Sequence, residues 1–239
     1  RFPVDRYSVA DLETIYWGFG RHFGTPVSQS VMGDRLGHVV DVTDTDPHAR
    51  AYRNRSELTL HTDFSDIVSF LCVRKAKSGG VSWFASALAI HNQILKTHPD
   101  LLDVLYRGFY WHRFREEGPD SAPVTPWRVP VFSRCQGKVS CRFITGYMYE
   151  AAAHENGETL SDLQVEALNY FDQVAHANGM PIHFTLEPGD AVFVNNFTVL
   201  HARTAFENDP DPTKRRLLLR LWMTVPDGRP VVPEIQIYD

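Results

Sequence analysis

Residues 215–225, RRLLLRLWMTV, alternate in polarity with a period of two, and this pattern constrains the fold more than any other feature of the chain. The odd positions from 217 to 225 are all apolar, whereas the even positions from 216 to 224 carry Arg, Leu, Arg, Trp and Thr. Such a repeat is typical of a β-strand with two different faces. We therefore predict a strand with one face in the core. Arg216 and Arg220 lie on the other face, about 13 Å apart at ~3.3 Å per residue, directed either to solvent or to a polar site.

A second period-two segment, LTLHTDF at residues 58–64, places His61 and Asp63 on the same side of a predicted strand. The pair could belong to a solvated polar face, or it could be a pair of metal ligands. The chain has another His-x-Asp at residues 98–100. There Pro and Asp stand where a helix begins, so we interpret that copy as structural.

The rest of the chain favours short strands separated by turns. Further strands are predicted in residues 66–76, 181–186 and 191–196, with a hairpin around residues 135–137 and loops at 33–56 and 116–128. Helices are predicted over residues 8–24, 85–97, 100–107 and 161–179, of which the first and last begin with capping boxes. Because the strands do not alternate strictly with helices, a doubly wound parallel sheet is disfavoured. We predict a mainly β fold, a β-barrel or jelly roll, with flanking helices.

The composition is that of a globular protein, and the length fits one large domain or, less easily, two small ones. The chain has 239 residues, of which 43% are hydrophobic, and this length can bury a sizeable core without disulfides. A net charge of −5 argues against nucleic acid or an anionic membrane as the main partner, and no segment approaches the ~20 apolar residues of a membrane span. The 3 cysteines lack metal-site spacing and indicate a reducing compartment, for which we predict the cytoplasm. We expect residues 1–239 to form a single domain. Since the chain begins at Arg1 rather than at methionine, we also expect that this domain lacks its N-terminal segment.

A further histidine, His201, follows the strand predicted at 191–196, so that the order along the chain is His-x-Asp, then His, then Arg216. Two imidazoles and one carboxylate on one face of a metal leave three positions open, which suits Fe(II) and oxygen chemistry. A zinc hydrolase could use similar ligands. It has no particular need of a fixed arginine downstream. A dicarboxylate cosubstrate does need one, because a guanidinium binds a carboxylate in a bidentate fork.

Four segments of the chain, HTDF, SGGVSWFA, GDAVFVNNFTVLHART and KRRLLLRLW, resemble in this order the motifs of the taurine dioxygenase (TauD/TfdA) and clavaminate synthase-like family. The resemblance extends over about residues 57–225. Members of that family are Fe(II)- and 2-oxoglutarate-dependent oxygenases with a double-stranded β-helix, a cupin-like jelly roll. The resemblance therefore implies this fold and these cofactors, with O2 as the other cosubstrate.

By this resemblance, His61, Asp63 and His201 would bind the iron. Arg216 would bind the distal carboxylate of 2-oxoglutarate with help from the hydroxyl of Ser82. Arg220 would contact the substrate or the other end of the cosubstrate. Arg215 is left out because strand parity places it on the apolar side. Relatives that halogenate have a small residue in place of the carboxylate that this chain keeps at Asp63, so the resemblance favours oxygenation.

The expected protein is an oxidoreductase, a dioxygenase that hydroxylates an unactivated C–H bond of a small anionic or amino-acid-like molecule and releases succinate and CO2. Desaturation and ring closure remain open. A non-catalytic jelly-roll module that binds a small anion, or a metal-dependent hydrolase, are the alternatives. Neither the substrate nor the oligomeric state follows from the sequence. Some aromatic residues are candidates for the substrate pocket, although most aromatic side chains lie in the core: Trp83, Trp111, Trp127, Tyr147 and Tyr149.

Overall fold

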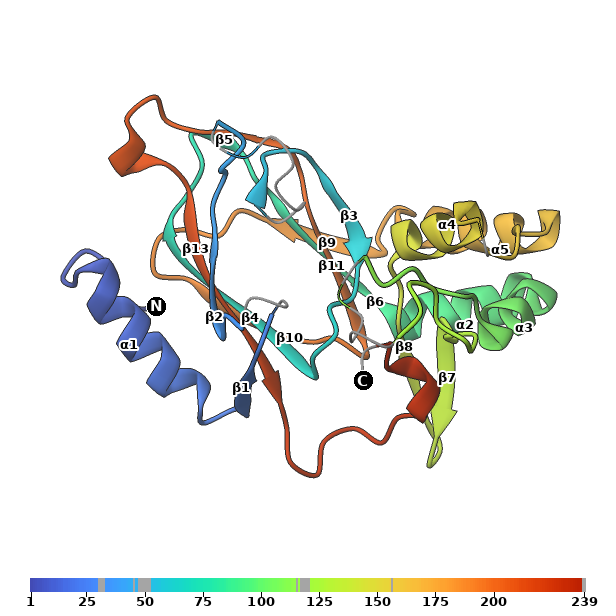
Figure 1. The fold of residues 1–239 in the computed structure, drawn as a ribbon. Coiled ribbons are helices and arrows are strands. Elements are labelled where there is room, and N and C mark those ends of the chain that lie inside the picture. The colour runs from blue at the N-terminus through green and yellow to red at the C-terminus, as the bar shows by residue number, and fades with distance from the viewer. Residues whose placement is uncertain are drawn as a thin grey trace.

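The computed structural model describes residues 1–29, 33–44, 46, 53–114, 116, 121–155 and 157–237. Its centre is a pair of antiparallel sheets (Figure 1). The first sheet is five-stranded, in the order β1-β13-β4-β10 with β2 also paired to β13. Its strands are β1 (Thr25–Val27), β2 (Leu36–Val39), β4 (Ile67–Arg74), β10 (Ala191–Asn195) and β13 (Leu217–Thr224).

The second sheet is four-stranded, in the order β3-β11-β6-β9. Its strands are β3 (Leu58–His61), β6 (Ser82–Ser86), β9 (Pro181–Phe184) and β11 (Val199–Arg203). The chain passes from one sheet to the other between neighbouring strands, from β3 to β4 and from β10 to β11. This arrangement is that of a double-stranded β-helix, and the predicted jelly roll is confirmed.

Two small strand pairs lie outside these sheets. They are β5 (Ser78–Gly79) with β12 (Phe206–Glu207), and β7 (Phe132–Cys135) with β8 (Lys138–Cys141). The second pair is the predicted hairpin, with a tighter turn than expected. Cys135 pairs directly with Lys138, so only Gln136 and Gly137 form the connection. Both have positive φ, as a type I′ turn requires.

Five α-helices flank the sheets in the described part of the chain. They are α1 (Val9–Gly20), α2 (Ala87–Thr97), α3 (Pro99–Arg107), α4 (Thr145–Ala153) and α5 (Asp162–Ala175). The first lies alone beside the five-stranded sheet, and the other four gather at the opposite side of the molecule (Figure 1). Both predicted capping boxes are present, at the starts of α1 and α5. No described helix is long and apolar enough to cross a membrane.

Strand β13 has the two faces that its sequence predicts. Leu217, Leu219, Leu221 and Met223 are buried in one cluster with residues of α1, including Leu12 and Tyr16. The opposite face, with Arg216 just before the strand and Leu218, Arg220 and Trp222 within it, lines a cavity. Alternate residues of this one strand therefore line the cavity and form the core on which α1 packs.

The structure corrects several predicted boundaries. The first helix ends at Gly20 rather than at Gly24. Gly24 instead allows the chain to approach β13 closely, because a Cβ there would lie 2.5 Å from the carbonyl oxygen of Thr224. The predicted loop at 33–56 contains β2, while its residues 45 and 47–52 lie outside the described part. Residues 117–120 of the predicted loop at 116–128 also lie outside it.

Several elements were not predicted, among them α4 and β11. Helix α4 begins without a side-chain cap, so it lacks the usual signal of a helix start. Strand β11 contains His201 and was missed, because its five residues, VLHAR, do not alternate in polarity.

Strand β3 is shorter than predicted and ends at His61, two residues before Asp63. The other His-x-Asp begins α3 with Pro99 in its first turn, as the structural interpretation predicts.

Candidate functional site

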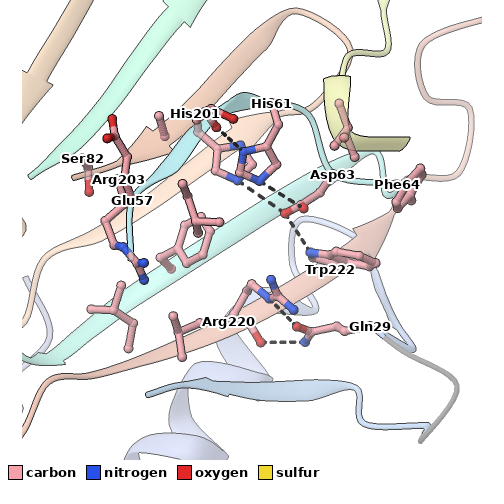
Figure 2. Close-up of a pocket in the computed structure, with 18 of the residues that line it drawn as sticks. Gln29, Glu57, His61, Asp63, Phe64, Ser82, His201, Arg203, Arg220 and Trp222 are labelled. Atoms are coloured by element: carbon pink, nitrogen blue, oxygen red, sulfur yellow. Dashed lines mark hydrogen bonds and ion pairs between the residues drawn. The ribbon is translucent and has the colours of Figure 1, made fainter. Parts of the chain in front are cut away.

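Three side chains that the sequence singles out lie together in the structure. Nε2 of His201 lies 3.5 Å from Oδ2 of Asp63, and Nε2 of His61 lies 3.8 Å from Oδ1 of the same carboxylate. One ligand atom from each of the three residues lies within 4.8 Å of the others. Figure 2 shows both imidazoles directed towards the carboxylate. Two nitrogen donors and one oxygen donor at this spacing could hold one metal ion.

Strand pairing positions the two histidines. His61 ends β3, His201 lies in the middle of β11, and the register of the two strands places these residues opposite each other. Their ring centroids are 4.3 Å apart. Nδ1 of His61 lies 2.8 Å from the carbonyl oxygen of Thr59. Because a carbonyl only accepts hydrogen bonds, Nδ1 carries the proton and Nε2 presents its lone pair to the site.

Asp63 is held by contacts from three other parts of the chain. Its backbone N–H donates to Oδ1 of Asn196 at 3.2 Å, and the guanidinium of Arg142 donates to its backbone carbonyl. The indole Nε1–H of Trp222 donates to Oδ2 at 3.0 Å. These bonds fix both the backbone and the carboxylate, as polar neighbours of metal ligands commonly do.

Burial and charge together set the protonation of this group. Burial alone raises the pKa of Asp63, but electrostatic interactions with His201, Arg220 and His61, together with the hydrogen bond from Trp222, outweigh it and hold the pKa below its ordinary value. Burial is also the main reason why the pKa of His201 falls to about 3, with a smaller contribution from His61. At neutral pH the site presents a carboxylate and a neutral imidazole, which are the protonation states that bind metals.

The three side chains open onto a cavity of about 660 Å³ that both sheets line. We call Ser82, Arg203 and Arg216 the basic end of this cavity. Phe64, Phe114, Tyr147 and Trp222 form its aromatic end, where successive ring centroids lie between 4.7 Å and 6.3 Å apart. In Figure 2 Ser82 and Arg203 lie on one side of the histidines, and Phe64 and Trp222 lie on the other. A cavity with two such ends can hold two small molecules next to one metal.

Arg216 is buried at the basic end, with 5% of its surface exposed. Its guanidinium carbon lies 4.9 Å from the centre of the Phe206 ring, and its Nη1 has no hydrogen-bond partner among the described residues. Burial lowers its pKa to about 10, and the neighbouring Arg203 acts in the same direction. The side chain is therefore still charged at neutral pH, and it faces a space where an anion would complete its hydrogen bonds.

The other two arginines of this region differ from Arg216. Nε of Arg220 donates to Oε1 of Gln29 at 2.6 Å, and Nε2 of Gln29 donates back to the carbonyl oxygen of Arg220 at 2.8 Å. Figure 2 shows this pair below the carboxylate of Asp63. Arg215 lies outside the cavity and forms an ion pair with Asp44 at 3.0 Å.

The sequence of this chain matches a known family over nearly its whole length. Residues 1–222 match the family described as "Taurine catabolism dioxygenase TauD, TfdA family". The chain belongs to this family. The resemblance noted from four short motifs is thereby confirmed.

Two curated relatives of this TauD family member are similar along most of the chain. FR-33289 synthase of Streptomyces rubellomurinus is 31% identical over 95% of this chain and 68% of its own length. The taurine hydroxylase-like protein SAT17 of Stachybotrys chartarum is 29% identical over 90% of this chain and 57% of its own length.

Solved structures of oxygenases share the fold. An asparagine oxygenase in complex with Fe(II), 2S,3S-3-hydroxyasparagine and succinate superposes with a TM-score of 0.63 at 21% identity, covering 84% of this chain and 60% of that one. The non-heme iron oxygenase OrfP in complex with Fe and alpha-ketoglutaric acid gives a TM-score of 0.66 at 15% identity, covering 90% of this chain and 65% of that one. The present chain thus spans somewhat less than two thirds of the length of these structures.

Of the five aromatic residues predicted for the pocket of this TauD family member, one lines it. Tyr147 belongs to the aromatic end, whereas Trp111 is fully buried in the core. Trp83 packs beside His183, with a centroid distance of 5.2 Å. Trp127 donates its indole N–H to the carbonyl oxygen of Glu234, and Tyr149 is 42% exposed. The pocket uses mainly phenylalanines that the sequence analysis did not single out.

Sequence reasoning also missed polar residues of the site. Arg203 lies two residues after His201 on β11, so period two would have placed it on the site face had this strand been recognised. Gln29 comes to Arg220 from 191 positions away, and Asn196 reaches Asp63 from 133 positions away. No local pattern announces such distant contacts.

Proposed function

We propose that this chain is an Fe(II)- and 2-oxoglutarate-dependent dioxygenase that hydroxylates an unactivated C–H bond of a small molecule. The observation that carries the proposal is the convergence of His61, Asp63 and His201 within 4.8 Å, at the wall of a cavity that also contains the buried Arg216. Membership of the TauD family and the iron and 2-oxoglutarate complexes of structural neighbours support it.

The residues of the chain divide into two roles in this proposal. His61, Asp63 and His201 would hold one Fe(II) through two nitrogens and one oxygen. Arg216 binds the distal carboxylate of 2-oxoglutarate, with the hydroxyl of Ser82 beside it at the basic end. Arg220, held by Gln29, faces the substrate or the other end of the cosubstrate.

The bound iron, with 2-oxoglutarate and O2, supplies the oxidation of the C–H bond and yields succinate and CO2. The protein binds and orients the cosubstrate and the substrate, and it shields them from water. Arg216 and His201 are both buried and both line the cavity, and Nη1 of Arg216 has no hydrogen-bond partner among the described residues. They therefore fit an anion and a metal respectively. The aromatic end, formed by Phe64, Phe114, Tyr147 and Trp222, limits the access of water to the substrate.

The substrate that we propose is small and anionic or amino-acid-like, and the reaction is hydroxylation. Structural neighbours were solved with 2S,3S-3-hydroxyasparagine and with (3S)-hydroxy-L-Arg, which supports an amino-acid-like substrate. A cavity of about 660 Å³ that also accepts 2-oxoglutarate leaves room for a molecule of this size. Amino acids, sulfonates, betaines and aryloxy acids are the compounds to screen first.

The test combines binding with turnover. Anaerobic addition of Fe(II) and 2-oxoglutarate should give the weak visible absorption band of their chelate, and admitting O2 with a substrate should give succinate. His201→Ala should abolish both. A chain that binds 2-oxoglutarate but never forms succinate would instead be an anion-binding module. Hydrolytic activity with Zn²⁺ and without 2-oxoglutarate would indicate a metal-dependent hydrolase.

A further inference from the structure

A second arginine lies buried at the basic end of the cavity. Arg203 has 6% of its surface exposed, little more than the 5% of Arg216. Its Nη2 donates to the backbone carbonyls of Asn54, at 3.1 Å, and of Ser56. Its Nε and Nη1 are buried and have no hydrogen-bond partner among the described residues. Half of the guanidinium is thus anchored to the chain, and the other half has donors that are not used.

The two guanidinium groups approach the same aromatic ring, that of Phe206, from different elements. Arg203 ends β11 in the four-stranded sheet, whereas Arg216 directly precedes β13 in the five-stranded sheet. The Phe206 ring lies 4.8 Å from the guanidinium carbon of Arg203 and 4.9 Å from that of Arg216. Ser82 is the register partner of Arg203 in the β6–β11 pair, so its hydroxyl belongs to the same group.

Among the described residues, none forms an ion pair that balances the charges of this group. Both side chains are guanidinium groups, which remain charged at neutral pH. Within the described residues, no carboxylate lies at ion-pair distance from either one. Asp41 acts on Arg203 only from farther away, and its carboxylate is hydrogen-bonded by Thr43 and Asn208. Two buried cations without a counter-ion are costly unless an anion binds between them.

We propose that Arg203 is a second cationic ligand for the carboxylate that Arg216 binds, so that the distal end of 2-oxoglutarate lies between two guanidinium groups contributed by the two sheets. This inference rests on the proposed function and adds a residue to it. The bonds from Nη2 to Asn54 and Ser56 hold the guanidinium in place before the anion arrives, and the free Nε and Nη1 supply the donors.

The experiment measures cosubstrate binding rather than turnover. Binding of 2-oxoglutarate to the anaerobic Fe(II) protein is followed by calorimetry for the wild type, Arg203→Gln and Arg203→Lys. Loss of a charge-assisted hydrogen bond should weaken binding by roughly 10- to 100-fold in Arg203→Gln, and Arg203→Lys should recover part of this loss. Arg113→Gln is the matched control. Arg113 is buried and its Nε is unpartnered among the described residues, but it lies outside the cavity lining.

A second ligand shows which end of the cosubstrate Arg203 contacts. 2-Oxopentanoate has the same carbon chain and chelating end as 2-oxoglutarate but lacks the distal carboxylate. Its affinity, measured by displacement, should change by less than about threefold in Arg203→Gln. Thermal unfolding of each variant without ligand reports any purely structural effect of losing the Asn54 and Ser56 contacts.

The inference is overturned if Arg203→Gln binds 2-oxoglutarate as the wild type does, or if it loses affinity equally for both ligands. Should Arg203→Gln not fold, the same comparison is made with Arg203→Lys, which should bind 2-oxoglutarate more weakly than the wild type and 2-oxopentanoate normally. Unchanged affinity of Arg203→Lys for 2-oxoglutarate would then overturn the inference. Failure of the proposed function is a different result. In that case the wild-type protein itself does not bind 2-oxoglutarate.

Discussion

The indole Nε1–H of Trp222 donates a hydrogen bond of 3.0 Å to Oδ2 of Asp63. This bond joins the cavity face of β13 to the segment after β3, and it connects the two sheets at the proposed metal site. It also orients the carboxylate, because a charge-assisted hydrogen bond favours one rotamer of the aspartate.

Trp222→Phe should therefore weaken metal binding while it keeps an aromatic ring in the cavity. Loss of such an outer contact commonly costs 10- to 100-fold in metal affinity. Anaerobic titration with Fe(II), or with Mn(II) as a redox-stable substitute, measures the effect. Trp127→Phe is the control, since its indole donates to the carbonyl oxygen of Glu234 and not to a site residue. Equal metal affinity in both variants would contradict the role given to the Trp222 bond.

Asp63→Gly removes the only carboxylate of the proposed iron site among the described residues. The metal would gain an open position for water or halide. We expect hydroxylation to fall by more than about 100-fold, because replacing a residue that only hydrogen-bonds a metal ligand already costs up to about 100-fold in activity. The assay is succinate formation coupled to substrate hydroxylation. Asp100→Gly, in the other His-x-Asp of the chain, should leave it unchanged. Full hydroxylation by Asp63→Gly would favour the polar-face interpretation of residues 58–64.

The three arginines near the start of β13 should respond differently to replacement by alanine. Arg216→Ala should weaken 2-oxoglutarate by about ten- to several-hundred-fold, since a buried bidentate partner is lost. Arg220→Ala should mainly weaken the prime substrate, and Arg215→Ala should have little effect because that side chain pairs with Asp44 outside the cavity. Paired titrations of cosubstrate and substrate check all three. Normal 2-oxoglutarate binding by Arg216→Ala, together with its loss in Arg215→Ala, would mean that the register is off by one residue.

Tyr16 of α1 predicts how stability changes at alkaline pH. Its hydroxyl is fully buried and donates to Oγ of Ser69 at 2.7 Å, and burial raises its pKa above the ordinary value of 10.0. In the unfolded chain the phenol ionises near pH 10, whereas in the folded protein it stays neutral. The contribution of Tyr16 to the free energy of unfolding is complete below pH 10. It is lost as the pH rises towards the pKa of the folded state, by up to ~1.4 kcal/mol per pH unit.

Tyr16→Phe should cost about 1 kcal/mol at neutral pH, because Ser69 loses its partner. It should also reduce the alkaline decline of the free energy of unfolding. Urea denaturation of both proteins at pH 8 and at pH 11 gives the comparison. Parallel declines would show that Tyr16 does not contribute to the pH dependence.

The parts of the fold that the sequence predicts correctly are those with a local cause. Both faces of β13 follow from a period-two pattern in one segment, and the starts of α1 and α5 follow from capping residues three positions apart. At 58–64 the pattern groups His61 with Asp63 although β3 ends at His61. Asp63 reaches the site through its contacts with Asn196, Arg142 and Trp222. The burial of Arg203 could not be predicted, since it depends on how two sheets meet around Phe206.

The alternation along β13 makes the pocket and the scaffold separately adjustable. Positions 218, 220 and 222 face the cavity, while 217, 219, 221 and 223 pack under α1. A library that varies only the even positions changes the side chains that face the cavity and leaves the packing under α1 unchanged. A single-residue insertion in the strand would instead exchange the two sets, because every side chain beyond it would change sides. Directed evolution of this protein should therefore tolerate point substitutions in β13 far better than changes in its length.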